Sequence, residues 1–357
     1  MNVKTLTASL AGTLLAFGCG EDAPGVSAPA PAALAADEIR IVGSSTVYPF
    51  STKVAQEYKN KTGRNVVVES TGSGGGHKLF CAGVGLEHPD ITNSSRRQKK
   101  SEFDQCAKNG VTEIVEVKIG YDGIVVANAL ESADLELTLK QLYLAFAKDV
   151  PTNDSDCTLR PNPNQTWADI DPNLPAAAIE AYGPPPTSGT RDAFVEIAME
   201  GGAKEIACLA ALRKENKDEF KRIAHTLRED GKWIDSGEND NAIVQTLVNT
   251  PTAVGVFGYS FLDQNIDKIK GAMIAGAEPT FENIASGDYP ISRSLYFYVK
   301  KAHAGLKKGI KEYALEFMSD EAAAPGGYLE EIGLVPLGDD ERANYREAIE
   351  NMKPYSQ

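Results

Sequence analysis

Short apolar runs of β type alternate with helical stretches through residues 39–120 of the 357-residue chain. The runs "EIRIVG" and "NVVVES" predict two buried strands, and "YPFSTKVAQEYKNKTG" between them predicts a helix that ends at Gly63. After the loop "TGSGGG" we expect a short helix from about His77, then a third strand, at an edge, in "PDITNSS" and a helix in "KSEFDQCAKNG". This βαβαβ order predicts a parallel sheet with helices on both of its faces.

The rest of the chain continues in the same style with more interruptions. The segment "TEIVEVKIGYDGIVVANAL" predicts two β runs divided at "GYDG". Later strands are expected in "AVGVFGYS" and "SLYFYVKK", and helices in "TLKQLYLAFAK", "RDAFVEIAME", "DNAIVQTLVNT" and "IKEYALEFMS". We therefore predict an α/β protein of two lobes, each a mostly parallel sheet flanked by helices, with chain crossings near Tyr121 and Gly258. Lobe 1 is expected to comprise residues 37–120 and 259–357, and lobe 2 residues 121–258.

The N-terminal segment reads as a targeting signal. In residues 1–18, Lys4 precedes the apolar stretch "LTASLAGTLLAFG", which is too short to span a membrane and suits a signal peptide. Cleavage before Cys19, with lipid added to its sulfur, fits the position directly after the apolar run, although "LAFGC" departs from the usual bacterial lipoprotein box. The alternative, cleavage after Ala35, lies far past the apolar core. We favour lipidation, with the Pro/Ala-rich residues 19–36 as a tether.

Export would place the other four cysteines in an oxidising compartment, where disulfides persist. Order along the chain favours the pairs Cys81–Cys106 and Cys157–Cys208, each closing a local loop, over the other pairings. Four buried thiols are the alternative. No CxxC occurs and the four histidines show no ligand spacing, so no metal site is expected.

The charge balance restricts the partners. Lys and Arg number 36 against 50 Asp and Glu, a formal net charge of −14, which argues against nucleic-acid binding. Such a charge also opposes long-range attraction of anions. Any anion site must therefore use local donors, within a Debye length of about 8–10 Å.

Four loops share one design, since each follows a strand or opens a helix and is rich in hydroxyl or free N–H groups. Open α/β sheets bind ligands beyond the carboxyl ends of their strands. Any one loop has an ordinary explanation: a Ser or Thr before a helix caps it, and "GSGGG" without a following GK[ST] is no nucleotide motif. Together they predict a site for a small, multiply hydrogen-bonded anion such as a tetrahedral oxyanion. The candidate residues are Ser44, Ser45, Thr46, Ser73, Gly74, Ser95, Arg96, Ser188, Gly189, Thr190 and Arg191.

Seven motifs in order, spread over about residues 39–350, resemble the phosphate-binding proteins of bacterial ABC-type phosphate uptake systems. They are "IVGSSTVYPF", "STGSGGGHKL", "DITNSSRRQK", "YDGIVVAN", "GPPPTSGTRDAFVE", "NDNAIVQTL" and "GVFGYSFL". The resemblance implies a two-lobed periplasmic-binding-protein fold of type II, with the anion clamped between the lobes. It also implies inorganic phosphate as ligand and delivery to permease and ATPase subunits of an ABC transporter.

The resemblance assigns roles to individual residues. First-lobe contacts fall on Ser45 or Thr46, on Ser73, and on Ser95 with Arg96. Second-lobe contacts fall on Ser188, Gly189 and Thr190. Asp122 of "YDG" would accept a proton from the ligand; the alternatives are that it caps its turn or pairs with Arg96.

The chain departs from the family pattern at two places. Some members carry an aspartate at the position of Arg96, and an arginine at the position of Pro184. The guanidinium of the site is therefore expected from Arg96, Arg191 or both. We expect no cofactor, a monomer, and a location in the periplasm or cell envelope with membrane contact only through the lipid anchor.

Three other functions compete with phosphate binding. Sulfate, molybdate or arsenate are alternative ligands. A hydrolase would need a GxSxG elbow, a base and an orienting acid, and the serine loops do not fit that elbow, so an enzyme is not expected. A surface adhesion or sensory protein that reuses the fold is the third class.

Overall fold

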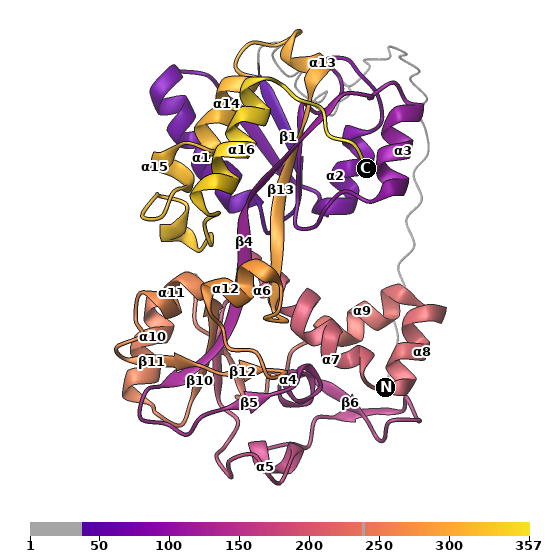
Figure 1. Ribbon diagram of the computed structural model, residues 1–357. Helices are drawn as coiled ribbons and strands as arrows, with labels where there is room; N and C mark the ends of the chain where they lie inside the picture. Colours follow the sequence, from indigo (N-terminus) through magenta and orange to yellow (C-terminus); the bar gives the residue numbers. More distant parts are fainter. Residues whose placement is uncertain (1–37, 238–239) are drawn as a thin grey trace, which may run out of the picture. The chain divides into compact units, whose positions relative to one another are not determined.

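The computed structural model describes residues 38–237 and 240–357. The expected signal peptide, the tether and lipidation at Cys19 lie outside these residues. The described residues belong to one compact unit, in which Figure 1 shows two lobes joined by the long strands β4 (Ile114–Ala129) and β13 (Ser292–Lys300). Within the described ranges, no helix is both long enough and apolar enough to cross a membrane.

The first lobe begins with the predicted alternation of strands and helices. These elements are β1 (Ile39–Gly43), α1 (Tyr48–Thr62), β2 (Val66–Ser70), α2 (Gly72–Phe80), β3 (Ile91–Ser94) and α3 (Lys100–Lys108). Helix α1 ends as predicted, because Gly63 adopts a left-handed conformation and its N–H reaches the carbonyl of Lys59. Strand β1 pairs in parallel with β2 on one side and β3 on the other.

Helix α2 begins at Gly72 instead of near His77, so the glycine run forms its first turns. Glycine has a poor helix propensity, but packing overrides it here. A Cβ atom on Gly76 would lie 2.5 Å from the Cα of Gly43 and 2.6 Å from Oγ1 of Thr92. Gly76 therefore lets α2 approach strands β1 and β3 closely.

We expect Gly76→Ala to lower the free energy of unfolding by about 1–3 kcal/mol, because the new methyl group meets backbone atoms that cannot rotate away. Gly74→Ala is the matched control, since a Cβ there would meet nothing within 4 Å. It should be neutral or stabilising by about 0.5–1 kcal/mol, the helix-propensity difference. Denaturant titrations of both variants check this; equal effects would contradict the packing argument.

The segment expected to form two β runs is one strand, β4 (Ile114–Ala129), which continues through "GYDG". Its partner β13 (Ser292–Lys300) runs antiparallel to it and also pairs with β3, so β3 is interior and β2 is the edge strand. The register shifts between Leu295 and Tyr296, opposite Lys118 and Gly120, which is a β-bulge. The motif "GYDG" therefore lies beside a bulge, at the point where β4 passes from one lobe to the other.

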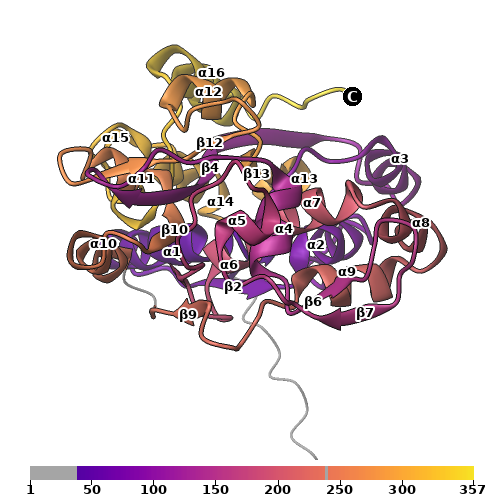
Figure 2. The ribbon, with the colours of Figure 1, turned by 90° about the horizontal axis from the view of Figure 1, so that it is seen from below.

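The second lobe contains most of the remaining elements. They are β5 (Glu136–Leu137), α4 (Leu139–Phe146), β6 (Asp149–Pro151), β7 (Leu159–Pro161), α5 (Trp167–Ile170), β8 (Ala181–Gly183), α6 (Gly189–Phe194), the π-helical η1 (Val195–Met199), α7 (Glu200–Lys204), α8 (Ala207–Glu215), α9 (Lys217–His225), β9 (Trp233–Asp235), α10 (Asp240–Asn249), β10 (Val254–Gly258), α11 (Tyr259–Asp263), β11 (Ile269–Gly271), β12 (Met273–Ile274) and α12 (Phe281–Ser286). Strands β8, β9 and β10 are parallel, while β10 and β11 pair antiparallel with the later half of β4. Figures 1 and 2 show α10 and α8 at opposite ends of this lobe.

Nine strands of the described chain join one sheet that extends through both lobes along β4, in the order β2-β1-β3-β13-β4-β10-β8-β9 with β11 also on β4. Strand β11 follows Gly258 in sequence yet pairs with Ala127–Ala129 of β4. This pairing groups the segment after Gly258 with lobe 2, and the chain returns through β13. The lobe boundaries stay a proposal, and we place the second crossing near Ser292 instead of near Gly258.

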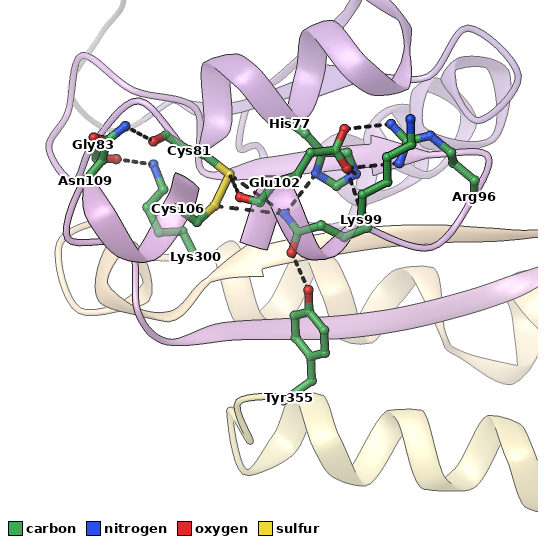
Figure 3. Close-up of a disulfide and its surroundings, with 11 residues drawn as sticks. His77, Cys81, Gly83, Arg96, Lys99, Glu102, Cys106, Asn109, Lys300 and Tyr355 are labelled. Atoms are coloured by element: carbon green, nitrogen blue, oxygen red, sulfur yellow. Dashed lines mark hydrogen bonds and ion pairs between the residues drawn. A yellow bond between two sulfur atoms is a disulfide. The ribbon is translucent and has the colours of Figure 1, made fainter. Parts of the chain in front are cut away.

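The chain ends on the first lobe. The final elements are α13 (Lys301–Ala304), α14 (Ile310–Phe317), α15 (Asp320–Ala323), the 3-10 helix η2 (Glu330–Ile332) and α16 (Asp339–Glu350). Beyond α16, the Tyr355 hydroxyl donates to the side-chain oxygen of Gln98, as a dashed line in Figure 3 marks.

Two disulfides have the pairing that chain order favours. Cys81, at the end of α2, is bonded to Cys106 in α3, with their Cα atoms 4.1 Å apart (Figure 3). Cys157 is bonded to Cys208 in α8, with a Cα separation of 5.3 Å. The second bridge ties the loop between β6 and β7 to helix α8.

Candidate functional site

A cavity of about 540 Å³ is lined by residues from both lobes and from the crossing strand β4. Six of the candidate residues line it: Ser45, Thr46, Asp122, Ser188, Gly189 and Thr190. The segment Glu331–Gly333 and residues Asp240 and Asn241 complete much of the wall. No lysine or arginine is among the lining residues in the described part of the chain, whereas three carboxylates are.

The first-lobe wall comes from the turn between β1 and α1. Ser44 is buried, and its Oγ accepts a hydrogen bond from the N–H of Val47, so this serine closes the turn. The two following residues line the cavity: Ser45 donates its hydroxyl to the carboxylate of Asp192, and Thr46 accepts from Arg293. The hydroxyl cluster therefore divides into one structural serine and two residues at the cavity.

The second-lobe wall is the start of a helical segment that runs from α6 through η1 into α7. The N–H of Ser188 donates to the carbonyl of Pro185, so the prolines form the turn that precedes the helix. Ser188 is the N-cap, and its Oγ accepts from the N–H of Thr190 at 3.2 Å. Ser188 thus both caps α6 and lines the cavity.

Arg293 contacts two lining residues of this cavity and was not predicted from the sequence. It lies opposite Asp122 in the pairing of β13 with β4, which brings their side chains together. Its guanidinium donates to Asp122 Oδ2 at 3.3 Å, to Thr46 Oγ1 at 2.6 Å and to Glu196 Oε2 at 2.8 Å. Arg293 does not itself line the cavity, but two of these three partners do. It therefore links the crossing strand, the first lobe and helical segment η1.

Two carboxylates at this wall have raised pKa values. Burial raises the pKa of Asp122 above its usual range, although the Arg293 charge and hydrogen bond oppose the shift. Burial likewise raises the pKa of Asp192, against the hydrogen bond from Ser45. Asp122 is 8% exposed and pairs with Arg293, not with Arg96. Such a carboxylate is suited to share a proton with a ligand hydroxyl.

The two arginines that the sequence offered for the site are engaged elsewhere. Arg96 forms a bidentate ion pair with Glu102 (Figure 3). The Glu102 carboxylate also accepts a hydrogen bond from the N–H of Lys99, at the start of α3. Arg191 donates to the carbonyl of Pro184 and to Asp235, and its guanidinium lies over the ring of Trp233. Neither side chain lines the cavity.

Ser73, Gly74 and Ser95 also lie outside the lining of the cavity. The Oγ of Ser73 accepts from the N–H of Ser95 at 3.0 Å, and the two hydroxyls are 3.1 Å apart. These residues follow β2 and β3, so they belong to the same carboxyl edge of the sheet as Ser45. The structure joins them to each other, and their contact with a ligand stays a prediction.

Weak sequence signals existed for the missed residues. Arg293 is the lone cation at the start of the apolar run "SLYFYVKK", and Asp240 lies within the quoted motif "NDNAIVQTL". Glu331 had no such signal. Among the described residues, no group of three or more potential metal ligands is present.

The family model described as PBP superfamily domain matches residues 28–321. The chain belongs to the PBP superfamily. Among curated relatives of this PBP superfamily member, Protein SphX of Synechococcus elongatus is 27% identical over 302 residues, covering 83% of this chain and 76% of its own length. Phosphate-binding protein PstS of Staphylococcus saprophyticus is 28% identical over 311 residues, covering 84% and 80%.

Solved structures that are similar to this chain are consistent with its place in the PBP superfamily. A possible phosphate binding protein from Planctomyces limnophilus has a TM-score of 0.68 at 26% identity, covering 88% of this chain and 98% of its own. An ABC-type phosphate transport receptor from Vibrio cholerae, at 20% identity and a TM-score of 0.53, supports the fold alone. The PBP superfamily member therefore has the expected two-lobed α/β fold.

Proposed function

We propose that the protein binds inorganic phosphate with high affinity in the cell envelope and delivers it to an ABC-type import permease. One observation carries the proposal: hydroxyl and N–H groups from both lobes, together with a buried carboxylate beside an arginine, meet at one cavity. Oxyanions are bound by such donors at helix starts, without an excess of positive surface charge. The names of the relatives and of the P. limnophilus structure support phosphate as the ligand.

Each part of the wall has a proposed role. The Thr46 hydroxyl, the backbone N–H of Ser45 and the start of α6 donate hydrogen bonds to phosphate oxygens, and Asp122 accepts one from a phosphate O–H. Arg293 supplies the positive charge in place of Arg96 and Arg191. Ser73, Gly74 and Ser95 stay proposed contacts for a form in which the lobes close further on the ligand.

Calorimetric titration of the ligand-stripped protein with phosphate, sulfate, molybdate and arsenate tests the function. Phosphate should bind far more tightly than sulfate. Tighter binding of sulfate or molybdate would favour the alternative oxyanion. Phosphate esters incubated with the protein should stay intact, since binding and delivery need no turnover; release of phosphate from them would support the hydrolase.

Ser188→Ala should weaken phosphate binding about 10–100-fold, because it removes one hydrogen bond to a charged group, on the order of 1.5–3 kcal/mol. It also removes an N-cap, so Thr166→Ala is the matched control: Thr166 caps α5 through a bond from the N–H of Asp169 and does not line the cavity. Both variants should lose about 1 kcal/mol of stability. Only Ser188→Ala should lose affinity in calorimetry, and equal affinities would remove Ser188 from the site.

We propose that Cys19 carries lipid and that the chain is a monomer held to the envelope by this anchor. Cys19→Ser should move the protein into the soluble fraction of cells washed at high salt, because no acyl chains remain to insert. Fractionation with a blot checks this. A wild-type protein that is already soluble, with an N-terminus near Asp37, would show cleavage after Ala35 instead.

A further inference from the structure

Basic side chains gather at one end of the first lobe, around a hollow of about 650 Å³. They come from the chain just after α1, from α13, from the start of α14 and from the stretch that joins these two helices. Figure 1 shows α13 at the end of the first lobe that lies away from the second lobe. We call this surface the basic patch; it consists of Arg64, Lys301, Lys307, Lys308 and Lys311, with the neighbouring Leu306.

Most of this charge is uncompensated. Lys301 pairs with Glu113, and Lys307 is buried and pairs with Asp90. Within the described ranges, Arg64, Lys308 and Lys311 form no ion pair, and the guanidinium of Arg64 donates to the backbone carbonyl of Lys308. The only acidic lining residue among those described is Glu312. The basic patch is therefore a locally positive surface on a chain whose formal net charge is −14.

An exposed apolar side chain projects beside these cations. Leu306 is 57% exposed and lies in the turn between α13 and α14, next to two lysines in sequence. Lysine and arginine around an apolar tip are the composition of surfaces that rest on anionic lipid bilayers, where the apolar group enters the interface. A binding site for a free ion would need no exposed leucine.

The position of the patch along the chain supports the same occupant. Lys307 Nζ donates to the carbonyl oxygen of Glu38 at 3.0 Å, so the described chain starts at the patch. Cys19, the proposed lipid anchor, precedes Glu38 in the sequence. Helix α1 separates the patch from the cavity: Tyr48 at its start lines the cavity, and its 15 residues span about 22 Å at about 1.5 Å each.

We propose that the basic patch docks on the surface of an anionic lipid bilayer. The inference does not depend on phosphate as the ligand. The first lobe then lies between the bilayer and the cavity, and the patch orients a molecule that its anchor holds near the membrane. The contact is peripheral and reversible, since three uncompensated cations give only a modest surface attraction.

Vesicle co-sedimentation of the full chain carrying Cys19→Ser tests the proposal. The parent protein should bind vesicles of phosphatidylglycerol and phosphatidylcholine better than pure phosphatidylcholine, and this preference should vanish at about 1 M salt, where the Debye length is about 3 Å. The triple variant Arg64→Gln, Lys308→Gln, Lys311→Gln should bind the anionic vesicles roughly a hundredfold more weakly, at about fivefold for each cation. Leu306→Ser should weaken binding as well.

A matched control removes the same charge from the other lobe. Arg213, Lys214 and Lys217 lie on α8 and α9, are exposed, and form no ion pair within the described ranges. Replacing all three by glutamine should leave the preference for anionic vesicles within a few-fold of the parent. Equal losses in both triple variants would show a net-charge effect and overturn the proposal.

Two further outcomes would also overturn it. One is unchanged binding of the patch variant, with its fold verified by circular dichroism. The other is displacement from anionic vesicles by inorganic phosphate at an ionic strength where sodium chloride has no effect, which would assign the patch to a free anion. Phosphate titrations of the patch variant should match the parent, so failure here is separate from failure of the proposed function.

Discussion

Arg293→Gln should weaken phosphate binding by a hundredfold or more. Arg293 lies behind Asp122 and Thr46, and a unit charge about 6 Å from a ligand charge contributes about 3 kcal/mol at an effective dielectric constant of about 20, which the neutral side chain loses. The variant also leaves Asp122 without its cation, so that carboxylate then repels the anion. The phosphate affinity of Arg293→Lys should lie between those of wild type and Arg293→Gln, because lysine keeps the charge but lacks the planar set of donors of a guanidinium. Calorimetry on variants of verified fold measures each affinity.

Arg96→Gln and Arg191→Gln are the matched controls for this prediction. Both remove a guanidinium that the sequence offered for the site, but each side chain is held by its own carboxylate, Glu102 or Asp235. We expect their phosphate affinities within a few-fold of wild type. A hundredfold loss in either control, with a small loss in Arg293→Gln, would return the guanidinium role to that control residue.

Asp122→Asn should reduce the preference for phosphate over sulfate by roughly a thousandfold. Near neutral pH phosphate keeps at least one proton, which an ionised carboxylate accepts, whereas sulfate offers only lone pairs. A buried carboxylate facing an unprotonated anion costs several kcal/mol, and the amide, which donates, removes that cost. Affinities for both ions, measured in wild type and variant, check this. A ratio that changes by less than about threefold would exclude Asp122, and Asp192 would be the next acid to replace.

The pH dependence of selectivity has a definite sign. Burial raises the pKa of Asp122, so as pH falls the carboxyl gains its proton at a higher pH than an exposed aspartate does. The protonated group donates to sulfate, and wild-type selectivity should therefore fall on acidification through that raised pKa. The Asn variant cannot titrate there, so its ratio should stay low and flat over the same range. Competition titrations at several pH values separate the two curves.

Local elements were predictable because their signals are local. The start and end of α1 follow from a proline in its first turn and Gly63 at its end, and both disulfide pairs follow the order of cysteines. The helical start in the glycine run was not predictable from propensity. It depends on Gly76 lying against Gly43, a contact between segments that only the folded chain brings together.

The pairing of strands that are far apart in the sequence could not be predicted. β13 lies between β3 and β4 although about 200 residues separate it from β3, and no local pattern encodes that neighbour. The same pairing brings Arg293 to Asp122. Arg293 is flanked by Ser292 and Ser294, but it lies in a run that predicts a strand, whereas the donor loops were sought where strands end. The hydroxyl loops of both lobes were found because hydroxyls and glycines before helices form a recognisable group.

Strand β4 limits where the chain can be divided to make chimeras or separate lobes. Its first half pairs with β13 and its second half with β10 and β11, so each lobe completes its sheet with part of the same strand. A boundary drawn between the lobes cuts β4 in the middle and exposes unpaired N–H and C=O groups on both sides. Chimeras that exchange a whole lobe with a relative must therefore take β4 and β13 from one parent, whereas grafts of single loops at the cavity leave that shared strand intact.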